Sequence, residues 1–212
     1  MRYNYIAIEG NIGAGKTTLA GKIADRFNGK LILEQFEDNP FLAKFYENQE
    51  KYAFPLELSF LAERYQQLKR ELANQDLFSS FTISDYFLNK SLIFARKTLN
   101  DDEYQLFITL FNIMNANLPR PDLLVHLYVS IGKLQQNIRS RGRSYEQRIP
   151  DQYLEKIQDS YLNYLKQQPQ LRILLLDINA LDFVAYPDHF RLIVDTIDKD
   201  YPRGITRIQL AG

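Results

Sequence analysis

The stretch Gly10-Asn11-Ile12-Gly13-Ala14-Gly15-Lys16-Thr17-Thr18 directly follows an apolar segment, residues 5–8. It matches the pattern G-x-x-x-x-G-K-[ST] of a phosphate-binding loop, and residues 19–27 after it have the apolar spacing of a helix. In such a loop, backbone N–H groups and the helix N-terminus surround a phosphate. Lys16 is placed to reach a transferred phosphoryl group, and the Thr17 hydroxyl to bind Mg²⁺. The sequence therefore predicts a site for a nucleoside triphosphate.

Apolar runs further along the chain predict the fold that carries this loop. Five of them read as strands, residues 3–9, 31–34, 81–85, 123–130 and 172–177, and most are continuously apolar, as in strands buried on both faces. Segments with helical periodicity separate them, at residues 40–50, 53–73, 86–98, 101–117, 132–141 and 151–167. The alternation predicts an α/β fold with a five-stranded parallel sheet and helices on both faces. We expect a single domain over residues 1–200 and a loosely attached tail over residues 201–212.

Composition excludes several classes of protein. Lys+Arg and Asp+Glu are balanced at 26 each, which argues against a broad surface for nucleic acid or membranes. The chain has no cysteine, so neither disulfides nor thiol catalysis is available. His126, one of two histidines, lies in an apolar run and is expected to be a satisfied core residue. With no long apolar stretch and no signal peptide, we expect a cytoplasmic protein.

Acidic residues close several predicted strands, where ligands bind in parallel α/β folds: Glu9, Glu34, Asp85 and Asp177. Asp85 stands where enzymes with this loop hold Mg²⁺, although it could instead cap the next helix. Glu34 could act as a base toward an acceptor hydroxyl or be part of an exposed acidic turn, and its position alone favours neither.

Two further groups of charged residues are candidates for binding. Arg139, Arg141 and Arg143 fall at a helix end and in the following loop, where they could close over a triphosphate as a lid or form a solvated face. Glu57 and Arg64 are seven residues apart on a predicted helix and therefore share one side of it. That spacing leaves a binding role and a pair of solvated charges both open.

Taken together, these segments resemble the deoxynucleoside kinases, most closely the bacterial deoxyguanosine kinases. The resemblance covers residues 6 to about 184. It is carried by the phosphate-binding loop, Glu34 with the following Glu37-Asp38-Asn39-Pro40-Phe41-Leu42, Tyr52-Ala53-Phe54-Pro55-Leu56-Glu57, Ser84-Asp85-Tyr86, Lys90-Ser91-Leu92-Ile93-Phe94-Ala95, Arg139-Ser140-Arg141-Gly142-Arg143-Ser144-Tyr145-Glu146 and Asp182-Phe183-Val184.

The resemblance implies a role for each matching residue. Glu34 matches the base that takes the proton of the 5′-hydroxyl, and Tyr46 with Glu146 match the residues that hold the sugar 3′-hydroxyl. The three arginines match the lid, and Asp182 with Phe183 border the donor base. The segment containing Asp85, Tyr86, Lys90 and Ser91 matches the substrate side. The resemblance further implies ATP and Mg²⁺ as cofactors, a small deoxynucleoside substrate and a homodimer.

Two positions depart from the wider family pattern. Tyr86 stands where many relatives have arginine, and we hypothesise that Lys90, one helical turn on, fills part of that role. Glu57 stands where the wider family has glutamine. An ionised carboxylate only accepts hydrogen bonds, so it suits the two adjacent donors of guanine, while Arg64 could donate to guanine O6 and N7.

These departures predict phosphorylation of a purine deoxynucleoside on its 5′-hydroxyl, with deoxyguanosine as the expected substrate. The alternatives are a deoxyadenosine kinase or a deoxynucleoside kinase of broad specificity. A nucleoside monophosphate kinase fits less well, because it needs cationic side chains to bind the acceptor phosphate. A non-catalytic GTP-binding switch also fits less well. It needs the guanine-binding motif Asn-Lys-x-Asp, and Asn89-Lys90-Ser91-Leu92 matches only half of that motif.

Overall fold

The computed structural model describes residues 1–35, 39–74, 78–143 and 146–211. The elements, in chain order, are β1 Tyr5–Gly10, α1 Lys16–Phe27, β2 Gly29–Ile32, α2 Leu42–Glu47, α3 Gln49–Ala73, β3 Phe81–Ser84, α4 Lys90–Thr98, α5 Asp101–Asn115, β4 Leu123–Tyr128, α6 Ile131–Arg141, α7 Asp151–Lys166, β5 Arg172–Asp177, α8 Pro187–Ile197 and β6 Gly204–Gln209. They form two compact units. We call Met1–Leu31, Leu77–Tyr86 and Pro121–Gly212 the sheet unit, and Ile32–Asp76 with Phe87–Arg120 the helical unit.

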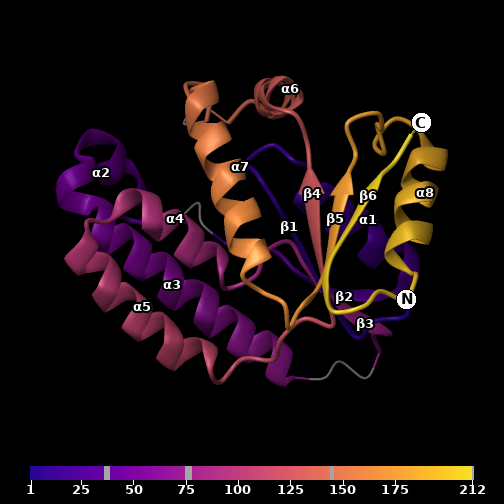
Figure 1. The fold of residues 1–212 in the computed structure, drawn as a ribbon, viewed down its shortest axis with the longest axis horizontal. Helices are drawn as coiled ribbons and strands as arrows, with labels where there is room; N and C mark the ends of the chain where they lie inside the picture. The colour runs from indigo at the N-terminus through magenta and orange to yellow at the C-terminus, as the bar shows by residue number, and fades with distance from the viewer. Residues whose placement is uncertain (36–38, 75–77, 144–145, 212) are drawn as a thin grey trace. The chain divides into compact units, whose positions relative to one another are not determined.

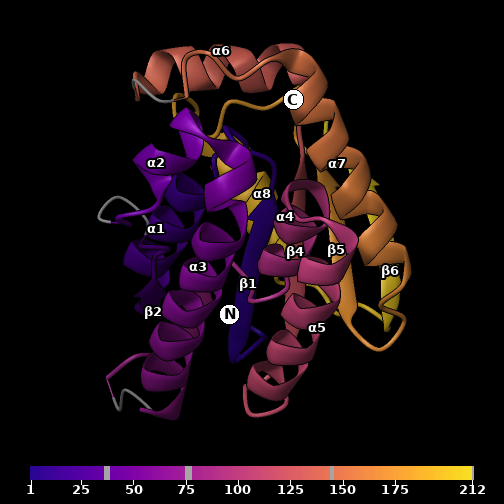
Figure 2. The same ribbon diagram turned by 90° about the vertical axis from the view of Figure 1, so that its left-hand side faces the viewer.

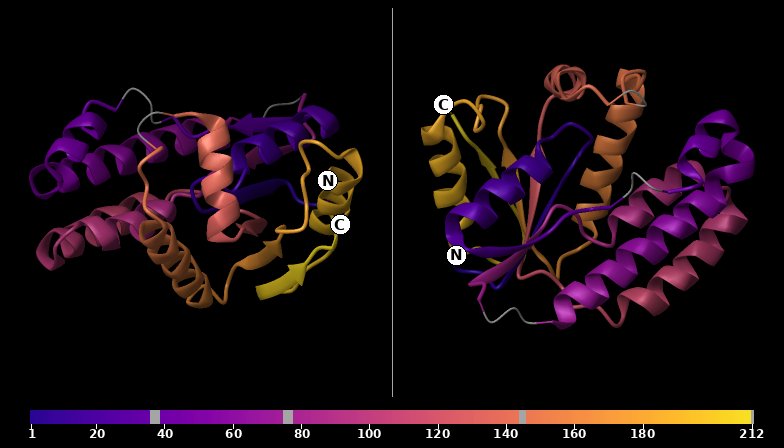
Figure 3. Two further views of the ribbon diagram at one scale, coloured as in Figure 1. Left: turned by 90° about the horizontal axis from the view of Figure 1, so that it is seen from above. Right: turned by 180° about the vertical axis from the view of Figure 1, so that it is seen from behind.

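The sheet has the strand order β2-β3-β1-β4-β5-β6, and β1 pairs in parallel with both β3 and β4. Within the sheet unit, α7 covers one face and α1 with α8 covers the other (Figures 1 and 3). The strand residues on the α1 side are apolar and fully buried, among them Ile6, Ile8 and Val125, and Leu19 and Ile23 of α1 lie in the same cluster. Burial of both faces explains why most strands are continuously apolar in sequence.

Glycines shape the turn between β1 and α1. Gly13 and Gly15 have φ of 82° and 87°, a left-handed conformation that side chains rarely adopt. A Cβ on Gly13 would also come within 2.8 Å of the Leu134 carbonyl oxygen. The turn therefore needs glycine for its conformation and for the close approach of α6, which runs across the carboxyl ends of the strands (Figure 2).

In the helical unit, α3 packs against α2, α4 and α5 (Figure 2). Asn48 ends α2 and begins α3, where its side chain accepts a hydrogen bond of 3.1 Å from the Lys51 N–H. Asn100 and Glu103 form a capping box at the start of α5. These caps fix where α3 and α5 begin.

The structure corrects several expectations. The sheet has six strands rather than five, because part of the expected tail is β6, which pairs in parallel with β5 from Arg172↔Gly204 to Asp177↔Gln209. A helix predicted over 40–50 is divided at Asn48, and one predicted over 86–98 begins at Lys90. The helix α8 was not predicted.

None of the helices within the described ranges combines the length and the apolar character that crossing a membrane requires.

Candidate active site

The phosphate-binding loop lines a cavity of about 720 Å³ in the sheet unit. Residues Gly13 to Thr18 form one wall, α6 contributes Lys133, Gln136 and Asn137, and the loop after β5 contributes Asp182 and Phe183. The Lys16 ammonium donates to the carbonyl oxygens of Gly10 and Asn11, both at 2.9 Å. This cavity brings the predicted phosphate loop and the predicted donor-base loop together.

Thr17 and Asp85 meet beside this loop. The Thr17 hydroxyl donates to Asp85 Oδ2 at 2.5 Å. Mg²⁺ prefers oxygen ligands and usually keeps waters and substrate phosphates around one or two protein groups. Two neighbouring oxygen side chains fit that requirement, and the described residues contain no cluster of three or more His, Cys, Asp or Glu that would hold a metal without phosphates.

Of the three predicted lid arginines, Arg141 and Arg143 line the cavity, whereas Arg139 is exposed and does not. Both cavity arginines pair with Glu146: Arg141 by a hydrogen-bonded ion pair and Arg143 at 3.5 Å. Glu146 is 7% exposed. The carboxylate predicted to hold the sugar thus also pairs with two of the predicted lid arginines.

Several contacts that anchor the loop were not predicted. The Asn137 side chain of α6 donates to the Gly13 carbonyl at 2.8 Å, and Asn11 of the loop donates to the Leu154 carbonyl of α7 at 2.8 Å. Lys133 donates to the Leu181 carbonyl at 2.6 Å. Loop, α6 and α7 are therefore tied together through backbone oxygens. Only Asn11 carried a signal in the sequence, as a member of the loop motif.

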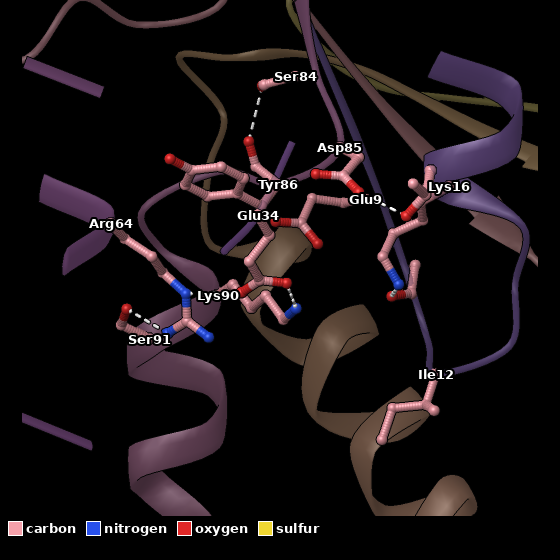
Figure 4. Close-up of polar contacts among 12 residues, drawn as sticks. Glu9, Ile12, Lys16, Glu34, Arg64, Ser84, Asp85, Tyr86, Lys90 and Ser91 are labelled. Carbon is pink, nitrogen blue, oxygen red and sulfur yellow. Dashed lines mark hydrogen bonds and ion pairs between the residues drawn. The ribbon is translucent and has the colours of Figure 1, made fainter. Parts of the chain in front are cut away.

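In the helical unit, Glu34 lies between two cations (Figure 4). Arg64 Nε donates to Glu34 Oε1 at 2.8 Å, and Lys90 Nζ donates to Oε2 at 2.5 Å. The Glu34 side chain is 9% exposed. Burial by itself would raise the pKa of this carboxyl, but Lys90 and then Arg64 outweigh it and lower the pKa to about 2. Glu34 is thus a buried, fully ionised carboxylate and not part of an exposed acidic turn.

Glu57 lies on α3 with a residue exposure of 4%. The Thr98 hydroxyl donates to Glu57 Oε1 at 2.9 Å. Burial raises the pKa of Glu57 to about 7, against the opposing effects of Arg64, of the Thr98 hydrogen bond and of Lys90. Arg64 also donates from Nη1 to Ser91 Oγ at 2.9 Å. The predicted substrate residues Glu34, Glu57, Arg64, Lys90 and Ser91 are therefore brought together in one unit.

The remaining predicted residues are placed differently. Tyr86 is fully buried, and its carbonyl accepts a hydrogen bond from Ser84. The backbone of Tyr46 lies in α2, but its side chain falls outside the described part of the structure, as do Glu37, Asp38, Ser144 and Tyr145 of the matching segments. The predicted role of Tyr46 and Glu146 in holding the sugar 3′-hydroxyl therefore stays a prediction.

Beneath the loop, Glu9 and His126 occupy paired positions on β1 and β4. Tyr161 of α7 donates to Glu9 Oε2 at 2.9 Å, and its ring lies 5.0 Å from that of His126. His126 is buried as expected, but within the described residues its Nδ1 has no hydrogen-bond partner, so the expected satisfied state is not observed. Asp177 accepts from the Asn179 backbone and side chain in the turn after β5. Glu9 and Asp177 therefore both form hydrogen bonds that connect neighbouring segments of the sheet unit.

Comparison with protein families matches residues 6–201 to the model described as deoxynucleoside kinase. The chain belongs to the deoxynucleoside kinase family. Among curated relatives, it is 36% identical to a deoxyguanosine kinase of Bacillus subtilis (strain 168), an alignment that covers 89% of this chain and 93% of that protein. It is 29% identical to a deoxyadenosine/deoxycytidine kinase of the same organism, over 91% and 90%.

A solved structure of deoxyadenosine kinase from M. mycoides with bound dATP superposes on this kinase with a TM-score of 0.76. The two are 26% identical, and the match covers 92% of this chain and all of that chain. The family, the fold and the activity class predicted from the sequence are therefore confirmed. The relatives differ from one another in the base that they accept, so the base that this kinase prefers has to be argued from its own residues.

Proposed function

We propose that this deoxynucleoside kinase transfers the γ-phosphate of ATP to the 5′-hydroxyl of deoxyguanosine. The observation that carries the guanine assignment is Glu57, a buried carboxyl group whose hydrogen bond from Thr98 occupies a single oxygen. Guanine presents its ring N–H and its amino group side by side, and an ionised carboxylate accepts from both. Adenine presents an acceptor beside its amino group, which an ionised carboxylate cannot match.

Glu34 is the group that receives the 5′-hydroxyl proton in this proposal. Its low pKa makes it a weak base, but phosphoryl transfer proceeds through a loose transition state, so the hydroxyl loses its proton late. Glu34 mainly orients the hydroxyl, and the proton moves to it as the new oxygen–phosphorus bond forms and the bond to the ADP oxygen breaks. Lys90 and Arg64 keep the carboxylate ionised and fixed for this task.

The phosphate side of the reaction is assigned to the loop and the lid. The backbone N–H groups of the loop and Lys16 bind the triphosphate, and Arg141 and Arg143 stabilise the charge that develops on the transferred group. Arg139 is assigned to the same lid on the family resemblance. Thr17 and Asp85 would hold Mg²⁺, which neutralises phosphate charge when it is bound.

A second candidate is a deoxyadenosine kinase, and one observation favours it. The pKa of Glu57 is about 7, so close to neutral pH a large fraction of the enzyme carries the protonated acid. A protonated carboxyl group both donates and accepts, as glutamine does, and is complementary to adenine. The same side chain therefore supports guanine when it is ionised and adenine when it is neutral.

Initial rates with deoxyguanosine, deoxyadenosine, deoxycytidine and thymidine, with ATP and Mg²⁺ at pH 8, test the proposal. We expect kcat/KM to be highest for deoxyguanosine, because Glu57 is mostly ionised at that pH. Preference for deoxyadenosine at pH 8 would favour the second candidate. Preference for a pyrimidine would remove the role given to Glu57.

A further inference from the structure

The contact between Glu57 and Thr98 joins the middle of α3 to the last residue of α4. Thr98 Oγ1 lies 2.9 Å from Glu57 Oε1 and 3.3 Å from the Phe94 carbonyl oxygen of its own helix. A hydroxyl has one proton and donates to one acceptor at a time, and the shorter distance is that to Glu57. No other hydrogen bond reaches Glu57 from the residues described, so Oε2 and the remaining lone pair of Oε1 are left for a ligand.

The charged groups near Glu57 do not replace Thr98. Arg64 of α3 and Lys90 of α4 both donate to Glu34, which follows β2, and they act on Glu57 through charge alone. The helices α2 and α5 also pack on α3. Their acidic and basic residues Lys44, Glu47, Asp101 and Asp102 are exposed, and Glu103 is engaged in the capping box. Thr98 is thus the neighbour that contacts the carboxyl group and sets its direction.

We propose that Thr98 is a positioning residue for base selection: its hydroxyl occupies one lone pair of Glu57 Oε1, holds the carboxylate so that both oxygens can accept from the base, and favours the ionised, guanine-accepting form. This inference rests on the proposed function, since it assumes that Glu57 reads the base. A donated hydrogen bond stabilises a carboxylate more than a neutral acid, which already carries its own proton. Loss of the hydroxyl therefore moves Glu57 toward the form that suits adenine.

The test compares Thr98→Val, which removes the donor at nearly constant volume, with the matched control Thr98→Ser, which keeps it. We measure the ratio of kcat/KM for deoxyguanosine to that for deoxyadenosine between pH 6 and pH 9. In the wild type the ratio rises with pH through about 7, as Glu57 ionises. In Thr98→Val we expect the midpoint to move to higher pH and the ratio at pH 7 to fall about tenfold, as for loss of a hydrogen bond to a charged group. Thr98→Ser keeps the wild-type profile.

Glu57→Gln separates a positioning role from a merely structural one. Its ratio is expected to be independent of pH, and adding Thr98→Val to it to leave the ratio independent of pH. If Thr98→Val does not fold, Thr98→Ala removes the same donor and takes its place.

If the ratio in Thr98→Val has the same pH midpoint as in the wild type, the role of Thr98 is overturned and the proposed function remains intact. A wild type that does not prefer deoxyguanosine at any pH would overturn the proposed function itself.

Discussion

At the scale of single residues, Glu34 shows how burial and pairing settle what a sequence leaves open. Its position at the end of an apolar run was equally consistent with a base and with an acidic turn. The structure encloses it between Arg64 and Lys90, 30 and 56 residues away along the chain. Buried charges persist only when they are paired, so this arrangement is typical of a functional carboxylate. Contacts of such long range carry no signal in local sequence patterns.

Lys90→Met tests whether the second cation on Glu34 matters. We expect kcat to fall at least tenfold, because the hydroxyl-orienting carboxylate loses the partner of Oε2. The pKa of Glu34 rises from about 2, so the rate of the variant falls with acidification at a higher pH than that of the wild type. Steady-state kinetics from pH 5 to pH 9 measure both effects.

Lys97→Met is the matched control, since Lys97 lies on the same helix and is exposed. An unchanged kcat in Lys90→Met would contradict the role of Lys90, including the hypothesis that it compensates for Tyr86 in place of arginine.

Arg64 marks the limit of reasoning from residue spacing. Its position seven residues after Glu57 correctly placed the two on one side of α3, because both are buried there. The expectation that Arg64 donates to guanine O6 and N7 took no account of other hydrogen bonds made by its guanidinium group. In the structure Nε and Nη1 already donate to Glu34 and Ser91. Discrimination between purines is therefore assigned here to Glu57.

At the scale of elements, strong and local signals gave correct predictions. Buried parallel strands such as β4 and β5 are continuously apolar, and β5 was predicted with its observed bounds. The edge strand β6 alternates between half-buried and exposed residues, begins at Gly204 and lies just after Pro202, so its sequence resembled a tail. The break between α2 and α3 depends on the helix cap formed by Asn48. Polar residues lie on both sides of Asn48, so the cap could not be recognised in the sequence.

The contact between β4 and α7 gives a prediction about acid stability. Burial, and to a smaller extent the charge of Lys16, lowers the pKa of His126 from 6.5 to about 3. In the unfolded chain the imidazole binds a proton below about pH 6.5, whereas in the folded protein it does so only near pH 3. The contribution of neutral His126 to the free energy of unfolding is therefore complete above pH 6.5. Between pH 6.5 and about pH 3 this contribution falls by about 1.4 kcal/mol for each pH unit of acidification.

His126→Leu isolates this effect. We expect its free energy of unfolding to depend less steeply on pH than that of the wild type between pH 6 and pH 4, and the two curves to run parallel above pH 7.5. Urea unfolding followed by circular dichroism measures both. Equal slopes in the acid range would show that His126 is not held neutral in the folded protein.

At the scale of the whole molecule, each unit carries half of the proposed chemistry. The sheet unit holds the phosphate loop, the oxygens proposed to bind Mg²⁺ and the proposed lid arginines, and the helical unit holds Glu34 and Glu57, the residue proposed to recognise the base. The phosphate half was predictable because a continuous motif encodes it. The substrate half is assembled from α3, α4 and the residues after β2, so it emerged from the family resemblance and from the structure rather than from any local pattern.

The most direct test of the guanine assignment is the ratio of kcat/KM for deoxyguanosine to that for deoxyadenosine at pH 8, in the wild type and in Glu57→Gln. Glutamine keeps the size of the side chain but offers a donor beside its acceptor, which matches adenine rather than guanine. We expect the ratio to favour deoxyguanosine in the wild type and to fall about tenfold or more in the variant. An unchanged ratio would contradict the conclusion that Glu57 selects the base.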